Sequence, residues 1–189
     1  MDNFSEKVSF IWGVADLLRG DYKQSEYGRV MLPFLVLRRL DQVLAPKREA
    51  VWEADEKYPA EKTPAKLRER MLLRASGETF YNTSRLDLDK MLADPTNIAA
   101  NLVGYVHGFS PNVRDIMERF RFETQIERLD GSDILFLVAR KFIAIDLHPD
   151  RVANHEMGYI FEELIRKFSE QSNETAGEHF TPREVIRFM

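Results

Sequence analysis

The most informative segment for the architecture is EYGRVMLPFLVLRRLDQVL, residues 26–44. Its middle is apolar at almost every position and not only along one stripe, as in a helix that is buried on most of its sides. Arg38, Arg39 and Asp41 follow the apolar run, so we expect the buried part of the helix to end at these charged residues. The segment therefore predicts a long central helix against which the other elements pack.

Shorter apolar patterns with helical spacing flank this central segment on both sides. Ser110 followed by Pro111 adds a start signal, because an N-cap side chain before a proline at the first helical position favours helix initiation. Ser132 is predicted to cap a later helix. The predicted helices cover about residues 4–18, 46–57, 64–74, 86–92, 95–106, 111–120, 124–129, 134–145 and 152–168.

Two segments allow more than one interpretation. Residues 134–139 fit a strand by length alone, but the apolar pattern continues to Ile145, which favours a helix. Residues 77–84 combine two aromatic residues with Asn and hydroxyl side chains, which favour local turns, so we expect a short strand or an ordered loop there. The predicted fold is therefore mainly α: a multi-helix N-terminal domain with one short extended segment near residues 77–84.

The composition restricts the class of protein. With 189 residues and 44% hydrophobic content, the chain can form one main core. It has no apolar run of membrane-spanning length and no signal-peptide pattern at its N-terminus, so we expect a cytoplasmic protein with no membrane partner. It has no Cys, and its four His show no metal-ligand spacing, which argues against disulfides and a structural metal. A net charge of −4 argues against DNA binding by bulk attraction, so any DNA contact should be local or depend on partners.

Two local features fit either a functional or a structural role. The predicted helix at residues 64–74 is the best local candidate for a nucleic-acid contact, although a solvated helix face is the favoured interpretation. Its basic residues are Lys66, Arg68, Arg70 and Arg74. The aromatic pair Phe80 and Tyr81 has the chemistry to stack on a base, but packing beside a core is favoured for it.

The C-terminal segment GEHFTPREVI, residues 177–186, contains the start signals of another helix. Thr181 is a good N-cap, Pro182 suits the first helical position, and Glu184 completes a capping box. Because a helix N-terminus has free N–H groups and a partial positive charge, it can bind a small anion. On the motif alone, a plain structural cap is the favoured interpretation.

GEHFTPREVI also resembles the entry segment of N6-adenine DNA methyltransferases, in particular of the modification subunit of type I restriction-modification systems. Further segments resemble the helical N-terminal domain of the same family and follow one another in the family's order. They are RVMLPFLVLRRL (29–40), FYNTS (80–84), GFSPNVRDI (108–116) and MGYIFE (157–162). Since these matches extend over nearly all 189 residues, the chain is identified as a member of this family.

The resemblance implies that the complete protein is a site-specific, adenine-specific DNA methyltransferase that transfers a methyl group from S-adenosylmethionine to adenine N6. In the family, the aromatic-Thr-Pro element contacts this cofactor. The matching positions predict a cofactor-binding site that consists of Glu178, His179, Phe180, Thr181, Pro182 and Arg183. The family's cofactor motif Phe-x-Gly-x-Gly and its catalytic motif Asn-Pro-Pro-aromatic do not occur in these 189 residues, so no catalytic residue is assigned to them.

The resemblance also implies a role in an assembly. The helical domain is expected to help clamp DNA and to contact a specificity subunit, a second modification subunit and, in the larger complex, a restriction subunit. We expect a helical N-terminal domain at residues 1–170, followed at residues 171–189 by a linker and the first helix of a truncated α/β methyltransferase domain. The alternative is a stand-alone helical protein-interaction module without catalysis, against which the unfinished helix at the C-terminus argues.

Overall fold

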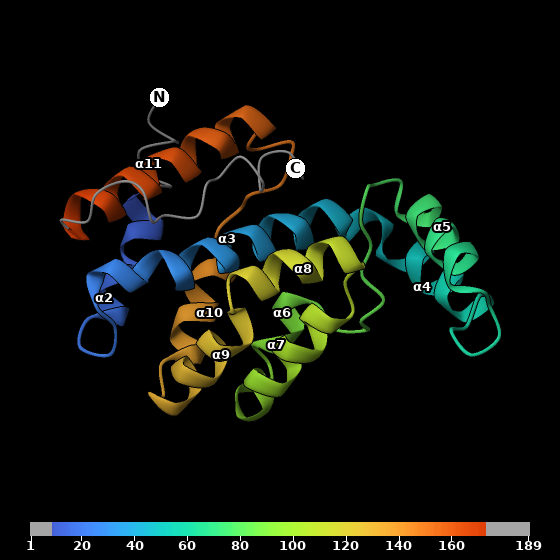
Figure 1. The fold of residues 1–189 in the computed structure, drawn as a ribbon, viewed down its shortest axis with the longest axis horizontal. Helices are drawn as coiled ribbons and strands as arrows, with labels where there is room; N and C mark the ends of the chain where they lie inside the picture. Colours follow the sequence, from blue (N-terminus) through green and yellow to red (C-terminus); the bar gives the residue numbers. More distant parts are fainter. Residues whose placement is uncertain (1–8, 173–189) are drawn as a thin grey trace.

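The computed structural model describes residues 9–172, and the regular elements in this range are all helices. They are α2 (Val14–Leu18), η1 (Gln24–Glu26), α3 (Tyr27–Leu44), η2 (Ala45–Lys47), α4 (Arg48–Lys57), α5 (Ala65–Ser76), α6 (Leu88–Met91), η3 (Pro95–Asn97), α7 (Ile98–His107), α8 (Pro111–Arg119), α9 (Phe122–Gly131), α10 (Leu135–Ile143) and α11 (Asn154–Ser172). Most of them surround one large core, and one helical pair projects from it (Figure 1). The predicted mainly α fold is confirmed, including the helix at α10.

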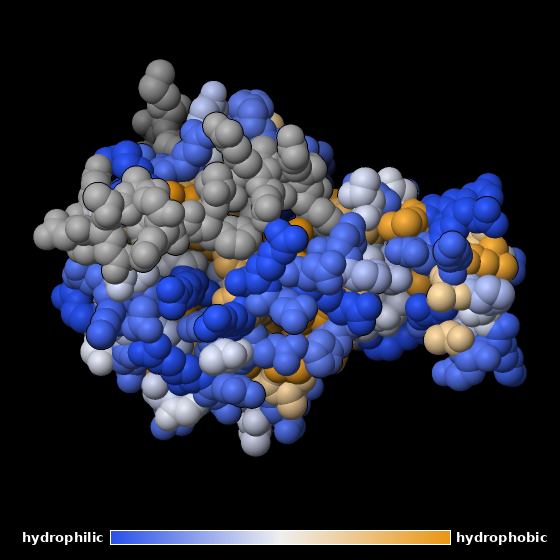
Figure 2. Space-filling view, in the orientation of Figure 1, coloured by the Kyte–Doolittle hydropathy of each residue, from blue (hydrophilic) through white to orange (hydrophobic). Residues whose placement is uncertain are grey.

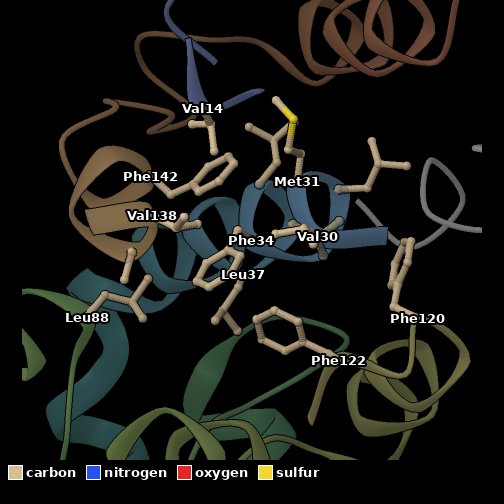
Figure 3. Close-up of a cluster of buried hydrophobic side chains, with 14 of the residues drawn as sticks. Val14, Val30, Met31, Phe34, Leu37, Leu88, Phe120, Phe122, Val138 and Phe142 are labelled. Atoms are coloured by element: carbon tan, nitrogen blue, oxygen red, sulfur yellow. The ribbon is translucent and has the colours of Figure 1, made fainter. Parts of the chain in front are cut away.

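α3 is the central helix of the fold. Every residue from 30 to 41 is buried, and the helix lies against α2, α9, α10 and α11. Phe34 illustrates the packing, because its ring lies between those of Phe122 and Phe142, at centroid distances of 4.9 and 5.2 Å (Figure 3). The apolar segment therefore forms the helix buried on most sides that its composition predicts.

The prediction that burial ends at Arg38, Arg39 and Asp41 is wrong. These three residues are themselves buried, with exposed fractions of 8%, 1% and 2%. Charged groups can leave water only if the fold supplies ionic or hydrogen-bonding partners. The C-terminal part of α3 is therefore buried through polar contacts as well as apolar ones.

α4 and α5 form a helical hairpin, here called the arm (residues 48–76), that stands apart from the main body (Figure 1, Figure 2). The two helices pack on each other and share with the following loop a small core of their own, which consists of Val51, Leu72 and Tyr81. Gly77 ends α5 with φ of 68°, a left-handed conformation that glycine adopts without strain. The arm is thus a separate packing unit joined to the body at its two ends.

Residues 77–84 form an ordered loop and not a strand. Tyr81 O accepts a hydrogen bond from Ser110 N at 3.0 Å, and Thr83 N donates one to Gly108 O at 2.9 Å. These bonds form only an isolated antiparallel bridge. The segment is extended where it runs alongside the backbone at residues 108–110, after the end of α7. It forms a single bridge there and no strand, because the chain continues from residue 111 as helix α8.

Two helix ends differ from the prediction. Residues 9–12 are helical, but a turn at Gly13 separates them from α2, so the predicted first helix is interrupted. Ser132 does not cap α10: it is the C-cap of α9, and Ile134 occupies the N-cap position of α10. The reason is a chain reversal at Asp133, whose φ is 57°. Ser132 therefore belongs to the end of one helix and not to the start of the next.

Candidate functional site

The cofactor-binding residues predicted from the sequence lie outside the residues that the structure describes. They are Glu178, His179, Phe180, Thr181, Pro182 and Arg183. Their grouping around a cofactor stays a prediction, as does the cap at Thr181. What the structure does describe is how the fold holds α11, the helix that precedes them in the chain.

α11 packs on α3 and η1 (Figure 1), and a connector at residues 144–153 joins it to α10. Arg39 of α3 binds this connector. Its guanidinium donates hydrogen bonds to Leu147 O, to Val152 O at 2.8 Å and to Asn154 Oδ1 at 2.6 Å. Because Asn154 is the first residue of α11, one buried side chain holds both the connector and the start of the helix.

The acceptors that Arg39 binds are neutral oxygens. Burial disfavours the charged guanidinium and lowers the pKa of Arg39 below its ordinary value. An arginine nevertheless stays protonated in proteins, because its ordinary pKa lies so far above neutrality. Hydrogen bonds from a charged donor are stronger than those between neutral groups, so this contact is a strong local constraint on the connector.

Two neighbours of Arg39 on α3 extend the contact. Arg38 Nε donates a hydrogen bond to Ile145 O at 3.0 Å, and Gln42 Oε1 accepts one from Leu147 N at 2.7 Å. The C-terminal half of α3 therefore binds the connector at several backbone groups. The position of α11 relative to the body depends on these contacts as well as on apolar packing.

The end of α3 also holds the arm. Asp41 Oδ1 accepts hydrogen bonds from Tyr105 Oη at 2.6 Å and from the Arg48 guanidinium at 2.7 Å. Arg48 is the first residue of α4, and its guanidinium also reaches Asp87 Oδ2 at 3.4 Å. The pair of Asp41 and Arg48 is partly buried, and an ion pair removed from water adds little net stability over apolar packing, so its main consequence here is geometric. It links α4 to α3, α7 and the residue before α6, and thereby specifies how the arm leaves the body.

The electrostatics of this cluster follow from its burial. Burial raises the pKa of Asp41 above its ordinary value, and the Tyr105 hydroxyl and the Arg48 guanidinium offset part of that effect. Burial and the neighbouring Asp41 carboxylate raise the pKa of Tyr105 well above its ordinary value, so its hydroxyl remains a donor at neutral pH. Burial also acts to raise the pKa of Asp87, but hydrogen bonds from Lys90 outweigh it, and the pKa of Asp87 is lowered.

The four basic residues of α5 do not act as one group. Arg68 pairs with Asp55 of α4, a contact inside the arm. Lys66, Arg70 and Arg74 are exposed and follow one another at intervals of four residues, so they lie along one side of α5, away from the arm's core. These three residues are called the basic row below.

Phe80 and Tyr81 do not form a base-stacking surface. Both are buried, with exposed fractions of 3% and 6%, which confirms packing as their role. Phe80 belongs to the main core, whereas Tyr81 belongs to the core of the arm. The pair therefore connects the two packing units.

Within residues 9–172, no group of three or more His, Asp or Glu side chains is placed to hold a metal ion. The helices of this range include none that is long and apolar enough to cross a membrane. The contacts described above give three candidate functional elements: the binding of the connector by Arg39, the contact of Asp41 with Arg48 at the base of the arm, and the basic row.

The roles of Arg39 and Asp41 are not evident from the sequence alone. A signal was present, because charged residues that directly continue a buried apolar run need partners inside the fold. The partners could not be identified from it, since the acceptors bound by Arg39 lie 108 to 115 residues further along the chain. Asp41 and its partner Tyr105 are 64 residues apart.

Comparison with known protein families gives two matches. Residues 7–142 match the family described as HsdM N-terminal domain, and residues 152–189 match the family described as N-6 DNA Methylase. No curated protein and no solved structure matches the chain at a significant level. The connector that Arg39 binds begins just after the first match and continues into the start of the second.

Proposed function

The chain belongs to the HsdM N-terminal domain family and is the N-terminal part of a type I restriction-modification methyltransferase subunit, and on this basis we propose that its helical domain holds the start of the catalytic domain and helps to clamp DNA. The connector contact supports this proposal. Arg39 lies in the first family match and Asn154 in the second, and the hydrogen bond between their side chains measures 2.6 Å. A residue of the helical domain thus directly positions the first helix of the methylase match.

In this proposal the complete subunit transfers a methyl group from S-adenosylmethionine to adenine N6 at specific DNA sites. The match to N-6 DNA Methylase supports this reaction and its methyl donor. The target adenine has to leave the duplex stack, because its amino group is otherwise out of reach of a catalytic pocket. A domain that holds the catalytic unit in a defined position and also contacts the DNA would keep that pocket aligned with the extruded base.

The remaining parts of the proposal follow from family membership. The chain is a component of a type I restriction-modification complex. Within it, we assign contacts to a specificity subunit, a second modification subunit and a restriction subunit, in the cytoplasm. The cofactor pocket would include residues 178–183. The predicted division between domains at residue 170 stays a prediction, and the N-6 DNA Methylase match begins at residue 152.

These 189 residues alone are expected to transfer no methyl group. They contain neither Phe-x-Gly-x-Gly nor Asn-Pro-Pro-aromatic. Incorporation of labelled methyl groups from S-adenosylmethionine into unmodified duplex DNA measures this, with the complete subunit plus specificity subunit as the positive control. Incorporation above background that tracks with the purified 189-residue chain would contradict the prediction. Absence of N6 methylation by the complete complex would contradict the proposed function itself.

Thr181→Ala in the complete subunit is expected to weaken cofactor binding by up to about fivefold, because the threonine N-cap stabilises the helix end assigned to the pocket by about 1 kcal/mol. Calorimetric titration with S-adenosylmethionine measures the change. Thr175→Ala, the same substitution six residues earlier in the chain, is the control and should leave affinity unchanged. Equal affinities of wild type and Thr181→Ala would show that Thr181 is not part of the pocket.

A further inference from the structure

The basic row on α5 does not hold the fold together. The fourth cation of the helix, Arg68, pairs with Asp55. Lys66, Arg70 and Arg74 are exposed, and within residues 9–172 no carboxylate lies within ion-pair distance of them. The helix carries four basic residues against one acidic residue, in a chain whose net charge is −4. Uncompensated positive charge is therefore concentrated on the outer side of one helix.

The dimensions of the basic row suit a polyanion. Successive cations are four residues apart, so they are separated by about 6 Å along the helix axis and the row is about 12 Å long. Duplex DNA carries one negative charge per roughly 1.7 Å of its axis, so a segment of that length presents about seven phosphates. Three long cationic side chains on this row can therefore contact several phosphates at once.

The outer side of α4 has the opposite charge. Glu49, Glu53 and Glu56 are exposed there, and among the described residues only Glu56 of these three forms an ion pair, with Arg85 at 2.8 Å. A polyanion is attracted by the α5 side of the arm and repelled by the α4 side. The arm therefore has one preferred face for a negatively charged partner. The arm itself projects from the body (Figure 2).

Contacts at the base of the arm fix its orientation. Arg48 is bound by Asp41 at 2.7 Å, and Trp52 Nε1 donates a hydrogen bond to Ser84 O at 2.8 Å. A surface that is held in place before binding loses less conformational freedom when a partner binds. The basic row is thus presented at a defined position relative to α3, the same helix that holds the connector.

We propose that the outer face of α5 binds the phosphate backbone of duplex DNA through Lys66, Arg70 and Arg74. This inference rests on the proposed function, which supplies the DNA duplex. The contacts position the DNA and do not read its sequence, because phosphates are the same at every base pair. Since the chain is acidic overall, three contacts give weak binding alone and add to the affinity of the assembled complex.

The test is a salt titration of duplex binding by the 189-residue chain, starting at low ionic strength and followed by fluorescence anisotropy of a labelled, unmodified duplex. The arm variant carries Lys66→Gln, Arg70→Gln and Arg74→Gln, which preserve helix propensity. The slope of log K against log salt is negative, and each lost phosphate contact reduces its magnitude by about 0.9. The magnitude should therefore fall by about 2.7 in the arm variant and by about 0.9 in Arg70→Gln alone.

The matched control carries Arg29→Gln, Arg114→Gln and Arg140→Gln, which remove three exposed cations outside the arm and change the net charge equally. It should leave the slope nearly unchanged. An unchanged slope in the arm variant, an equal loss in the control, or no DNA binding by the wild-type chain at the lowest salt would each overturn the inference. Polyglutamate that binds as tightly as DNA at equal charge would overturn it in favour of an acidic protein partner.

An assay of methyl transfer by the complete complex distinguishes a failure of this inference from a failure of the proposed function. If the complex methylates DNA and the arm variant keeps its wild-type slope, the inference fails and the function stands. If the complex does not methylate DNA, the function fails regardless of the slope. Urea unfolding of the arm variant and of Arg70→Gln, followed by circular dichroism, identifies the variants that are folded and can be compared.

Discussion

Arg39→Met is expected to lower the free energy of unfolding by about 2–4 kcal/mol, because it removes the charged donor from buried oxygen acceptors. The substitution leaves Leu147 O, Val152 O and Asn154 Oδ1 without this donor. Methionine has nearly the same helix propensity as arginine and fills an irregular space well. The loss therefore reports the polar contact and not a change in the helix or a large cavity.

Urea unfolding followed by circular dichroism measures this change, with Arg29→Met as the matched control. Arg29 is on the same helix but exposed, so its replacement should alter the free energy of unfolding by less than about 0.5 kcal/mol. A loss below about 1 kcal/mol in Arg39→Met would show that apolar packing alone holds the connector.

The same variant tests whether α11 separates from the body before the rest unfolds. Trp12 lies beside Phe168 of α11, with ring centroids 5.4 Å apart. In a Trp52→Phe background, Trp12 is the only tryptophan, and its fluorescence reports on α11. For Arg39→Met we expect the fluorescence change at lower urea than the loss of helical signal. Coincident transitions would mean that α11 and the body unfold as one unit.

Gly108→Ala is expected to lower the free energy of unfolding by about 2–3 kcal/mol through overpacking. A Cβ atom at this position would lie 2.4 Å from Asn82 Oδ1 and 2.8 Å from both Ser84 N and Ser84 Cβ. The backbone conformation is not the reason, since φ of Gly108 is −69°. The requirement is the close approach of residues 77–84 to the end of α7, where backbone atoms cannot move aside without breaking the bridge.

Gly104→Ala, one helical turn earlier, is the control for this substitution. Gly104 lies inside α7, and among the described residues nothing is within 4 Å of a Cβ atom built there. Alanine in a helix interior is favoured over glycine by about 0.5–1 kcal/mol, so Gly104→Ala should stabilise the protein. Thermal or urea unfolding of the pair measures both effects. Equal stabilities of Gly108→Ala and wild type would show that the loop can be displaced at little cost.

Much of the fold could be predicted from the sequence because helices are encoded by residues close together in the chain. The apolar run of α3, the proline at the start of α8 and the continued apolar pattern through α10 are each local signals, and each corresponds to a helix. The prediction for Ser132 is wrong because the left-handed turn at Asp133 leaves no comparable local pattern in the sequence.

Less of the candidate site than of the fold could be predicted from the sequence. The cofactor site at residues 178–183 stays a prediction from resemblance, because it lies outside the residues that the structure describes. The basic helix was recognised from its composition, but only the structure separates the internal pair of Arg68 with Asp55 from the three outward cations. Whether a charged residue is paired or free depends on the neighbouring helix.

The helical class, the central helix and the family follow from apolar periodicity and motif order, which are properties of the chain alone. By contrast, tertiary contacts make Arg39 bind the connector, make Asp41 bind Arg48 at the base of the arm and leave no room for a side chain at Gly108. Arg39 and Val152 are 113 residues apart, and Asp41 and Arg48, although only seven residues apart, lie on different helices. Such pairings depend on how the helices pack on one another, which local patterns do not encode.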